Sequence, residues 1–150
     1  MKVIFCRSHT PSSWLVRLLT WSEWSHVVLV HHDGVHAVEA VWPRVRETTV
    51  DKVAAHNAVC ELVDFPCQFP HVAYKWAQDQ VGKWYDLSAL FGFIIHRDMA
   101  HPGRWFCSEL VAEAFHQGWS PLFREALIDR ITPQDLWKLP GKDASQDGVA

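Results

Sequence analysis

The sequence has little of what marks a nucleic-acid-binding protein or a disulfide-rich domain. Its 14 Lys and Arg residues are outnumbered by 17 Asp and Glu residues, for a formal net charge of -3. No surface can then carry the cation excess that nucleic acid requires, so we expect no nucleic-acid partner. The four cysteines, Cys6, Cys60, Cys67 and Cys107, show no CxxC spacing. This excludes a disulfide scaffold and a zinc ribbon.

Long apolar runs are also missing. The longest, Leu87 to Ile95, is about half of a membrane span and is interrupted by Ser88 and Gly92. The N-terminal segment from Met1 to Arg7 lacks the apolar stretch of a signal peptide. We therefore expect a cytoplasmic protein with no integral membrane segment and with reduced thiols.

The composition that is present indicates one folded domain. Hydrophobic residues make up 49% of the 150 residues, which suits a single core. We expect one domain over residues 1–140 and a flexible polar tail over residues 141–150. The nine tryptophans are consistent with a ligand groove walled by indole rings, although filling of the core is an equally good account of most of them.

Local patterns predict an α+β domain. Runs rich in β-branched residues predict strands at Val3–Arg7, Val27–Val30, Val35–Val41, Arg44–Thr48 and Cys60–Phe65. Capping residues and apolar stripes predict helices at Trp14–Thr20, Val50–Ala55, Pro70–Val81, from Cys107 to Gly118, and at Thr132–Leu139. Strands gathered early and helices gathered late favour an antiparallel sheet with helices packed against it.

Cys107 is the first candidate for chemistry. It begins an amphipathic helix, where free backbone N–H groups and the helix dipole favour a thiolate and can bind an oxyanion. Taken alone, Cys107 is better explained as a small buried residue of the apolar stripe.

A histidine and a glutamate are placed together by the hairpin around Asp33-Gly34. A two-residue or four-residue loop there pairs Val28 with Glu39 and puts His26 on the same face of the sheet, diagonal to Glu39. A carboxylate directed at an imidazole is the arrangement that orients a general base. The alternative is an ordinary cross-strand ion pair.

The order of these residues resembles a known family. The matching segments are Trp24-Ser25-His26-Val27, then Glu39, Tyr85-Asp86 and Phe106-Cys107-Ser108-Glu109-Leu110-Val111. They resemble the circularly permuted, YiiX-like branch of the NlpC-type papain-like cysteine peptidases and amidases, in which the histidine strand precedes the cysteine helix. The resemblance implies a central antiparallel sheet with the cysteine helix packed against it.

The resemblance also implies roles for individual residues. Cys107 would be the nucleophile, His26 the base and Glu39 the third member of the triad, with Tyr85 near the oxyanion or substrate. We expect Ser108 at the helix start to contribute to the same subsite. Four tryptophans close to these residues are candidate groove walls: Trp21, Trp24, Trp84 and Trp105.

The expected function is a cysteine hydrolase that cleaves an amide through a thioester, without a cofactor. Relatives act on small peptide or acyl-amide substrates, often of the cell wall. Two alternatives stay open: an acyltransferase that passes the acyl group to a lipid or an amine, and a module that binds a peptide or an aromatic ligand without turnover. The facing pair His31 and His36 could bind a metal, but no third ligand is evident from the sequence, so we expect no metal site. The oligomeric state is left open.

Overall fold

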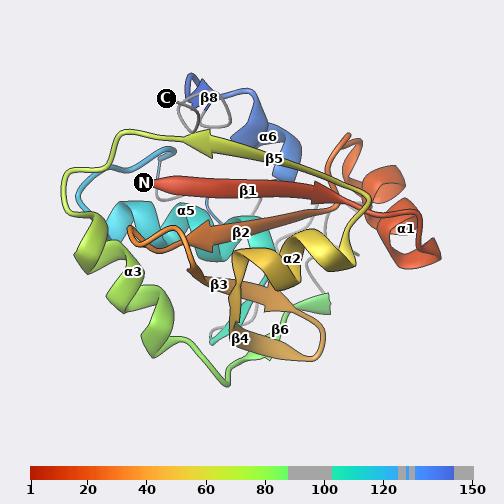
Figure 1. The fold of residues 1–150 in the computed structure, drawn as a ribbon, viewed down its shortest axis with the longest axis horizontal. Coiled ribbons are helices and arrows are strands. Elements are labelled where there is room, and N and C mark those ends of the chain that lie inside the picture. The colour runs from red at the N-terminus through yellow and green to blue at the C-terminus, as the bar shows by residue number, and fades with distance from the viewer. Residues whose placement is uncertain (88–102, 125–127, 129–130, 144–150) are drawn as a thin grey trace.

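A computed structural model describes residues 1–87, 103–124, 128 and 131–143 (Figure 1). Most of the longest apolar run, residues 88–95, and most of the expected tail, residues 144–150, lie outside the described residues. The described strands are β1 (Lys2–Arg7), β2 (His26–Val30), β3 (His36–Val41), β4 (Arg44–Thr49), β5 (Val59–Asp64), β6 (Trp84–Tyr85), β7 (Arg104–Trp105) and β8 (Lys142–Asp143).

These strands form one sheet of eight, in the order β7-β6-β4-β3-β2-β1-β5-β8. Neighbours run antiparallel except for β6 and β7, which are parallel. The five strands expected from the sequence are all present. The three two-residue strands were not expected, because segments so short carry no alternation of polar and apolar residues.

The last of these short strands changes the expected end of the folded unit. Lys142 and Asp143 pair with Asp64 and Val63 at the β5 edge of the sheet. A Cβ atom built on Gly141 would clash with the Val63 side chain, so the chain packs tightly where it enters β8. The sheet therefore extends past the expected boundary at residue 140.

The described helices are α1 (Pro11–Thr20), α2 (Val50–His56), α3 (Pro70–Asp79), α5 (Cys107–Gln117) and α6 (Pro133–Trp137). Helix α1 begins before the expected Trp14, because Thr10 is its N-cap and accepts a hydrogen bond from the Ser13 backbone N–H. The other helices begin and end close to the expected residues. Within the described ranges, no helix has the length and apolar character that a membrane span needs.

The helices cover both faces of the sheet. One face packs against α3 and α5 in the main core, which includes Phe5, Leu29 and Leu110, each with no exposed surface. The opposite face forms a smaller core around Val28 and is covered by Val53 of α2. Figure 1 shows α2 in front of β2 and α5 behind it. The predicted α+β architecture, with the cysteine helix packed on an antiparallel sheet, is confirmed.

Candidate active site

The β2–β3 hairpin positions a histidine and a glutamate as its register predicts. Leu29 pairs with Val38 and Val30 pairs with Ala37, and in the same register Val28 lies opposite Glu39. The loop spans residues 32–35, and the backbone N–H of His31 donates to the carbonyl of His36 at 2.8 Å. The predicted register is therefore confirmed.

His26 and Glu39 are in direct contact across the hairpin. Nε2 of His26 lies 2.7 Å from Oε2 of Glu39, and the side chains are 16% and 5% exposed. A buried carboxylate needs a charged or hydrogen-bonded partner to offset its lost hydration. This contact fixes the orientation of the imidazole and leaves Nδ1 as its second functional nitrogen.

Cys107 is a second partner of the His26 side chain. It is the first residue of α5 and is 1% exposed, and its side chain forms a hydrogen bond with His26. Glu109 fixes the start of this helix, because its Oε2 accepts from the backbone N–H of Phe106 at 3.1 Å. The fold thus brings together a thiol, an imidazole and a carboxylate from a helix and two strands.

Arg46 is a further member of the cluster that the sequence analysis missed. It lies directly opposite Glu39 on β4, and its Nε and Nη2 are each 2.8 Å from Oε1 of Glu39. The two carboxylate oxygens therefore have different partners, His26 and Arg46. The signal was present in the sequence, because the two-residue Trp42-Pro43 loop pairs Val41 with Arg44 and hence Glu39 with Arg46.

The charges in this cluster favour an imidazolium held by a carboxylate. Burial lowers the pKa of His26, but hydrogen bonds to Cys107 and to Glu39 outweigh this effect and raise the pKa to about 9. For Glu39, burial raises the pKa, whereas the bonds to His26 and Arg46 lower it, and the net change is a decrease. Burial, followed by the nearby Cys107 and Glu109, raises the pKa of Tyr85 well above its ordinary value.

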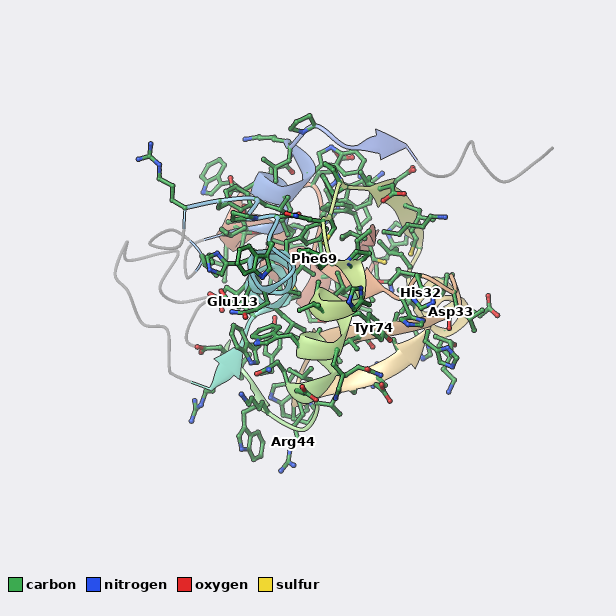
Figure 2. All side chains as sticks on the ribbon, turned by 90° about the vertical axis from the view of Figure 1, so that its left-hand side faces the viewer. His32, Asp33, Arg44, Phe69, Tyr74 and Glu113 are labelled. Atoms are coloured by element: carbon green, nitrogen blue, oxygen red, sulfur yellow. The ribbon has the colours of Figure 1, made fainter. Side chains whose placement is uncertain are left out.

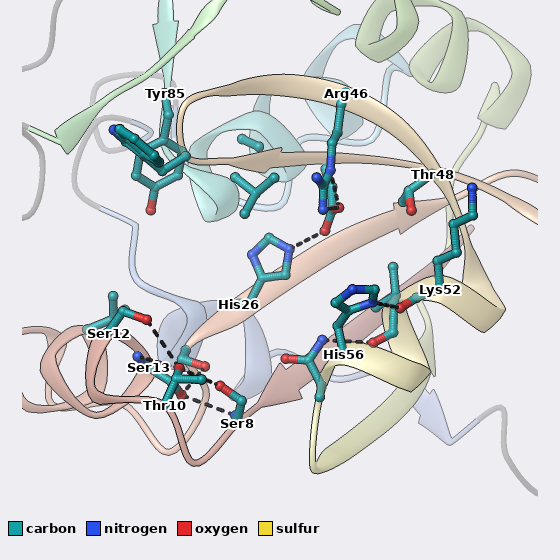
Figure 3. Close-up of a pocket in the computed structure, with 18 of the residues that line it drawn as sticks. Ser8, Thr10, Ser12, Ser13, His26, Arg46, Thr48, Lys52, His56 and Tyr85 are labelled. Atoms are coloured by element: carbon teal, nitrogen blue, oxygen red, sulfur yellow. Dashed lines mark hydrogen bonds and ion pairs between the residues drawn. The ribbon is translucent and has the colours of Figure 1, made fainter.

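A pocket of about 620 Å³ opens beside the cluster (Figure 3). His26, Glu39, Arg46 and Tyr85 line it, and Figure 3 shows the Tyr85 hydroxyl directed into the pocket. Cys107, which is 1% exposed, does not line the pocket, whereas its partner His26 does. The remaining wall combines hydroxyl groups, other polar or charged side chains and apolar side chains: Ser8, Thr10, Ser12, Ser13, Ser25, Thr48, Glu47, Lys52, His56, Asn57, Leu15, Val16, Ala40, Val41, Trp42, Val53 and Leu87.

Trp24 and Trp105, two tryptophans expected in the site, do not line this pocket. Trp24 is 2% exposed and packs against Phe5 and Trp137 in the main core. Trp105 packs against Trp76, with its Nε1–H 3.3 Å from Oε1 of Gln80. The expectation that these two indoles form groove walls is corrected, because Trp24 is buried in the main core and Trp105 is partly buried against it.

Ser108 requires a similar correction. Its side chain has no exposed surface and its hydroxyl donates to the carbonyl of Ile131, so only its backbone N–H could serve an oxyanion. Of the other candidate groove walls, Trp21 is 91% exposed at the end of α1, and Trp84 lies under the guanidinium of Arg44, 4.3 Å from ring centroid to Cζ. Neither lines the pocket.

Comparisons with known proteins agree with this architecture. No protein-family model matches the sequence, and no curated protein matches it. Among solved structures, the chain is similar to the metalloprotein YiiX from Escherichia coli O157:H7, with a TM-score of 0.61 and 22% sequence identity. The match covers 78% of this chain and 64% of YiiX, so the chain spans less than two thirds of that protein. The chain therefore has the permuted papain-like fold that the resemblance implied.

Proposed function

We propose that this protein is a cysteine hydrolase that cleaves an amide or ester bond, with Cys107 as nucleophile, His26 as base and Glu39 as the orienting carboxylate. The observation that carries the proposal is that the side chain of His26 interacts with both Cys107 and Glu39. An ordinary cross-strand ion pair would account for His26 and Glu39, but not for a thiol in contact with the same imidazole. The YiiX-like fold supports the same class of enzyme.

The first half of the proposed reaction forms an acyl-enzyme. His26 takes the proton of the Cys107 thiol, and the thiolate attacks the substrate carbonyl carbon. The oxyanion that forms lies near the free N–H groups at the start of α5 and near the Tyr85 hydroxyl. Collapse of this intermediate expels the amine or alcohol, which takes the proton from His26 and leaves a thioester.

The second half releases the acid. His26 takes a proton from a water molecule, the hydroxide attacks the thioester carbonyl, and Cys107 leaves as the thiolate and recovers its proton. Throughout this cycle Glu39 accepts from Nε2 of His26, which keeps the Nδ1 side free for proton transfer. Arg46 is a positioning residue that does not contact His26 in this scheme: it binds the other oxygen of Glu39 and so holds the carboxylate in place.

The test is activity-based labelling with a cysteine-directed acyl probe, followed by peptide mass mapping. We expect the label on Cys107, with loss of labelling in Cys107→Ala and strong reduction in His26→Ala. The matched control is Cys67→Ala, which removes a half-buried thiol outside the cluster and should label like the wild type. Absence of label on Cys107 in folded protein would reject the hydrolase and leave the pocket as a binding site for a peptide or aromatic ligand.

Acyl transfer involving a lipid is the second candidate, and the surface of α1 favours it. Four large apolar side chains are exposed on or just after this helix: Trp14 at 58%, Leu15 at 47%, Leu18 at 52% and Trp21 at 91%. Leu15 also lines the pocket. Tryptophan and leucine on one side of a short helix are typical of a segment that lies in a membrane interface.

The two candidates make different predictions for substrates and vesicles. Hydrolysis of peptide or acyl-amide libraries, including cell-wall peptides, should yield a free acid, whereas transfer from a lipid ester should yield an acylated amine or alcohol. The wild type should co-sediment with phosphatidylcholine–phosphatidylglycerol vesicles, whereas a Trp14→Ser, Trp21→Ser double variant should stay in the supernatant. Trp119→Ser is the control, since Trp119 is 74% exposed but far from α1 in sequence. Equal sedimentation of all three proteins would remove the lipid candidate.

A further inference from the structure

A second cluster of polar side chains lies at the turn between β2 and β3, at the opposite end of β2 from His26. His31, Asp33 and His36 each offer one ligand atom, and these atoms lie within 4.8 Å of one another. Nδ1 of His31 is 3.0 Å from Oδ2 of Asp33, and Nδ1 of His36 is 2.6 Å from the same oxygen. The sequence alone showed the two facing histidines, and the folded turn adds the carboxylate between them.

The backbone of the turn holds Asp33 in this orientation. Its Oδ1 accepts from the backbone N–H groups of Val35 at 2.8 Å and His36 at 3.0 Å. Oδ2 is thereby directed at the two imidazoles. A carboxylate whose outer oxygen is fixed by hydrogen bonds is a pre-oriented metal ligand, in the way that supporting contacts orient ligands in known metal sites.

Two buried polar atoms beside the turn lack hydrogen-bond partners among the described residues. One is Nδ1 of His31, whose 3.0 Å approach to Asp33 does not have hydrogen-bond geometry, and the other is the Tyr74 hydroxyl. Tyr74 is 4% exposed, and its ring centroid lies 4.5 Å from that of His31. Figure 2 shows Tyr74 of α3 beside the turn that carries Asp33. Unpartnered buried polar atoms are costly, and a cation bound at Nδ1 of His31 would give that atom a partner.

We propose that His31, Asp33 and His36 bind one first-row divalent cation, with zinc as the best match. Two imidazole nitrogens and one carboxylate oxygen are the donor set that zinc accepts, with a fourth position left for water. Bonds of about 2.0–2.1 Å in tetrahedral geometry separate ligand atoms by roughly 3.3 Å. The two observed separations from Oδ2 are 3.0 and 2.6 Å, so they need to widen by about 0.3 and 0.7 Å to admit the ion.

A bound cation would add a second link between the two strands of the hairpin. It joins the end of β2 to the beginning of β3, the two strands that carry His26 and Glu39. The cation site stands independently of the proposed hydrolase, because none of its ligands belongs to the Cys107 cluster.

The proposal is tested by titrating zinc chloride into the chelator-dialysed protein in a calorimeter. Four variants are compared with the wild type: Asp33→Asn, His36→Ala, His71→Ala and Cys107→Ala. Asp33→Asn keeps an oxygen for the backbone N–H groups and so preserves the turn, while His71→Ala removes an exposed histidine of α3 outside the site. We expect one equivalent to bind to wild type, His71→Ala and Cys107→Ala, and affinity to fall at least about tenfold in the other two.

Thermal unfolding provides a second measurement, because a ligand that binds only the folded state raises the Tm. Zinc should raise the Tm of the wild type and of His71→Ala, and should not raise that of Asp33→Asn. Three results would each overturn the proposal: no zinc binding by the wild type, affinity unchanged in both Asp33→Asn and His36→Ala, or loss of binding in Cys107→Ala alone. The last result would locate the zinc at the thiol instead.

Discussion

Substitution of Glu39 by glutamine tests the proposed triad through the behaviour of Arg46. In the protein, Oε2 of Glu39 is bound by His26 and Oε1 by Arg46. A glutamine has a single acceptor oxygen and an NH2 donor, so it can accept from only one of these partners. Arg46 can only donate, whereas a neutral imidazole can also present a lone pair. The introduced amide should therefore turn its oxygen to Arg46 and its NH2 to His26.

This orientation puts the imidazole in the wrong tautomer. With Nε2 accepting from the amide, the ring proton must sit on Nδ1, beside Cys107, where the ring can no longer accept the thiol proton. A hydrogen bond to a charged group contributes about 1.5–3 kcal/mol and a neutral one about 0.5–1.5 kcal/mol. Because Arg46 is 59% exposed, solvent weakens its hydrogen bond to the introduced amide. We therefore take the orientation with the amide oxygen toward Arg46 to be favoured by about 1 kcal/mol, which is about a fivefold excess over the orientation with the oxygen toward His26.

Removing the competing donor should reverse the effect. In a Glu39→Gln, Arg46→Met double variant the amide oxygen is free to face His26, so proton acceptance at Nδ1 returns. The measurement is the rate of chloroacetamide alkylation of Cys107 at pH 7, which requires no substrate. We expect Glu39→Gln to be slower than the wild type and the double variant to recover about fivefold relative to it. A double variant no faster than Glu39→Gln, with both folded and with Arg46→Met near the wild-type rate, would refute this reasoning.

Three further predictions follow from burial and charge. Cys6 and Cys107 are 0% and 1% exposed, but burial and then the Cys60 thiol raise the pKa of Cys6 far above its ordinary value, so alkylation should be faster at Cys107; equal rates would contradict its role as nucleophile. Leu110→Ala should lower the free energy of unfolding by about 2–5 kcal/mol in urea titrations, because Leu110 is fully buried. A loss below about 1 kcal/mol would contradict its place in the core. The pKa of His26 is raised from 6.5 to about 9, so its interactions stabilise the fold fully below about pH 6.5 and this stabilisation disappears as the pH rises through about 9; a His26→Gln variant with the same pH dependence as the wild type would exclude this assignment.

The elements that could be predicted from the sequence are those specified by short-range patterns. The hairpin register followed from the position of Asp33-Gly34, and it placed His26 diagonal to Glu39 as observed. The start of α5 at Cys107 followed from its apolar stripe and from Gly118 at its end. Both features depend on residues within one hairpin or one helix, so tertiary packing had little room to alter them.

The misplaced tryptophans show where such patterns stop being informative. Trp24 lies two residues before His26, which made a groove wall plausible, but its ring points into the core between Phe5 and Trp137. Which side of the chain a bulky residue faces outside a regular strand depends on partners that arrive from distant segments. Trp137 is such a partner and belongs to α6, more than a hundred residues later.

The same distinction explains which contacts of the cluster were accessible to sequence reasoning. Glu39 touches His26 and Arg46 through two successive hairpins, so both contacts follow from loop length once the strands are assigned. Cys107 reaches His26 only because α5 packs on the sheet through Leu110 and its neighbours, and no local rule sets where along the sheet that helix comes to rest. The contact between His26 and Glu39 is thus fixed by the strand register, while the contact between His26 and Cys107 is fixed by packing in the core. Substitutions in the α5 core should therefore disturb the Cys107–His26 contact before they disturb the contact between His26 and Glu39.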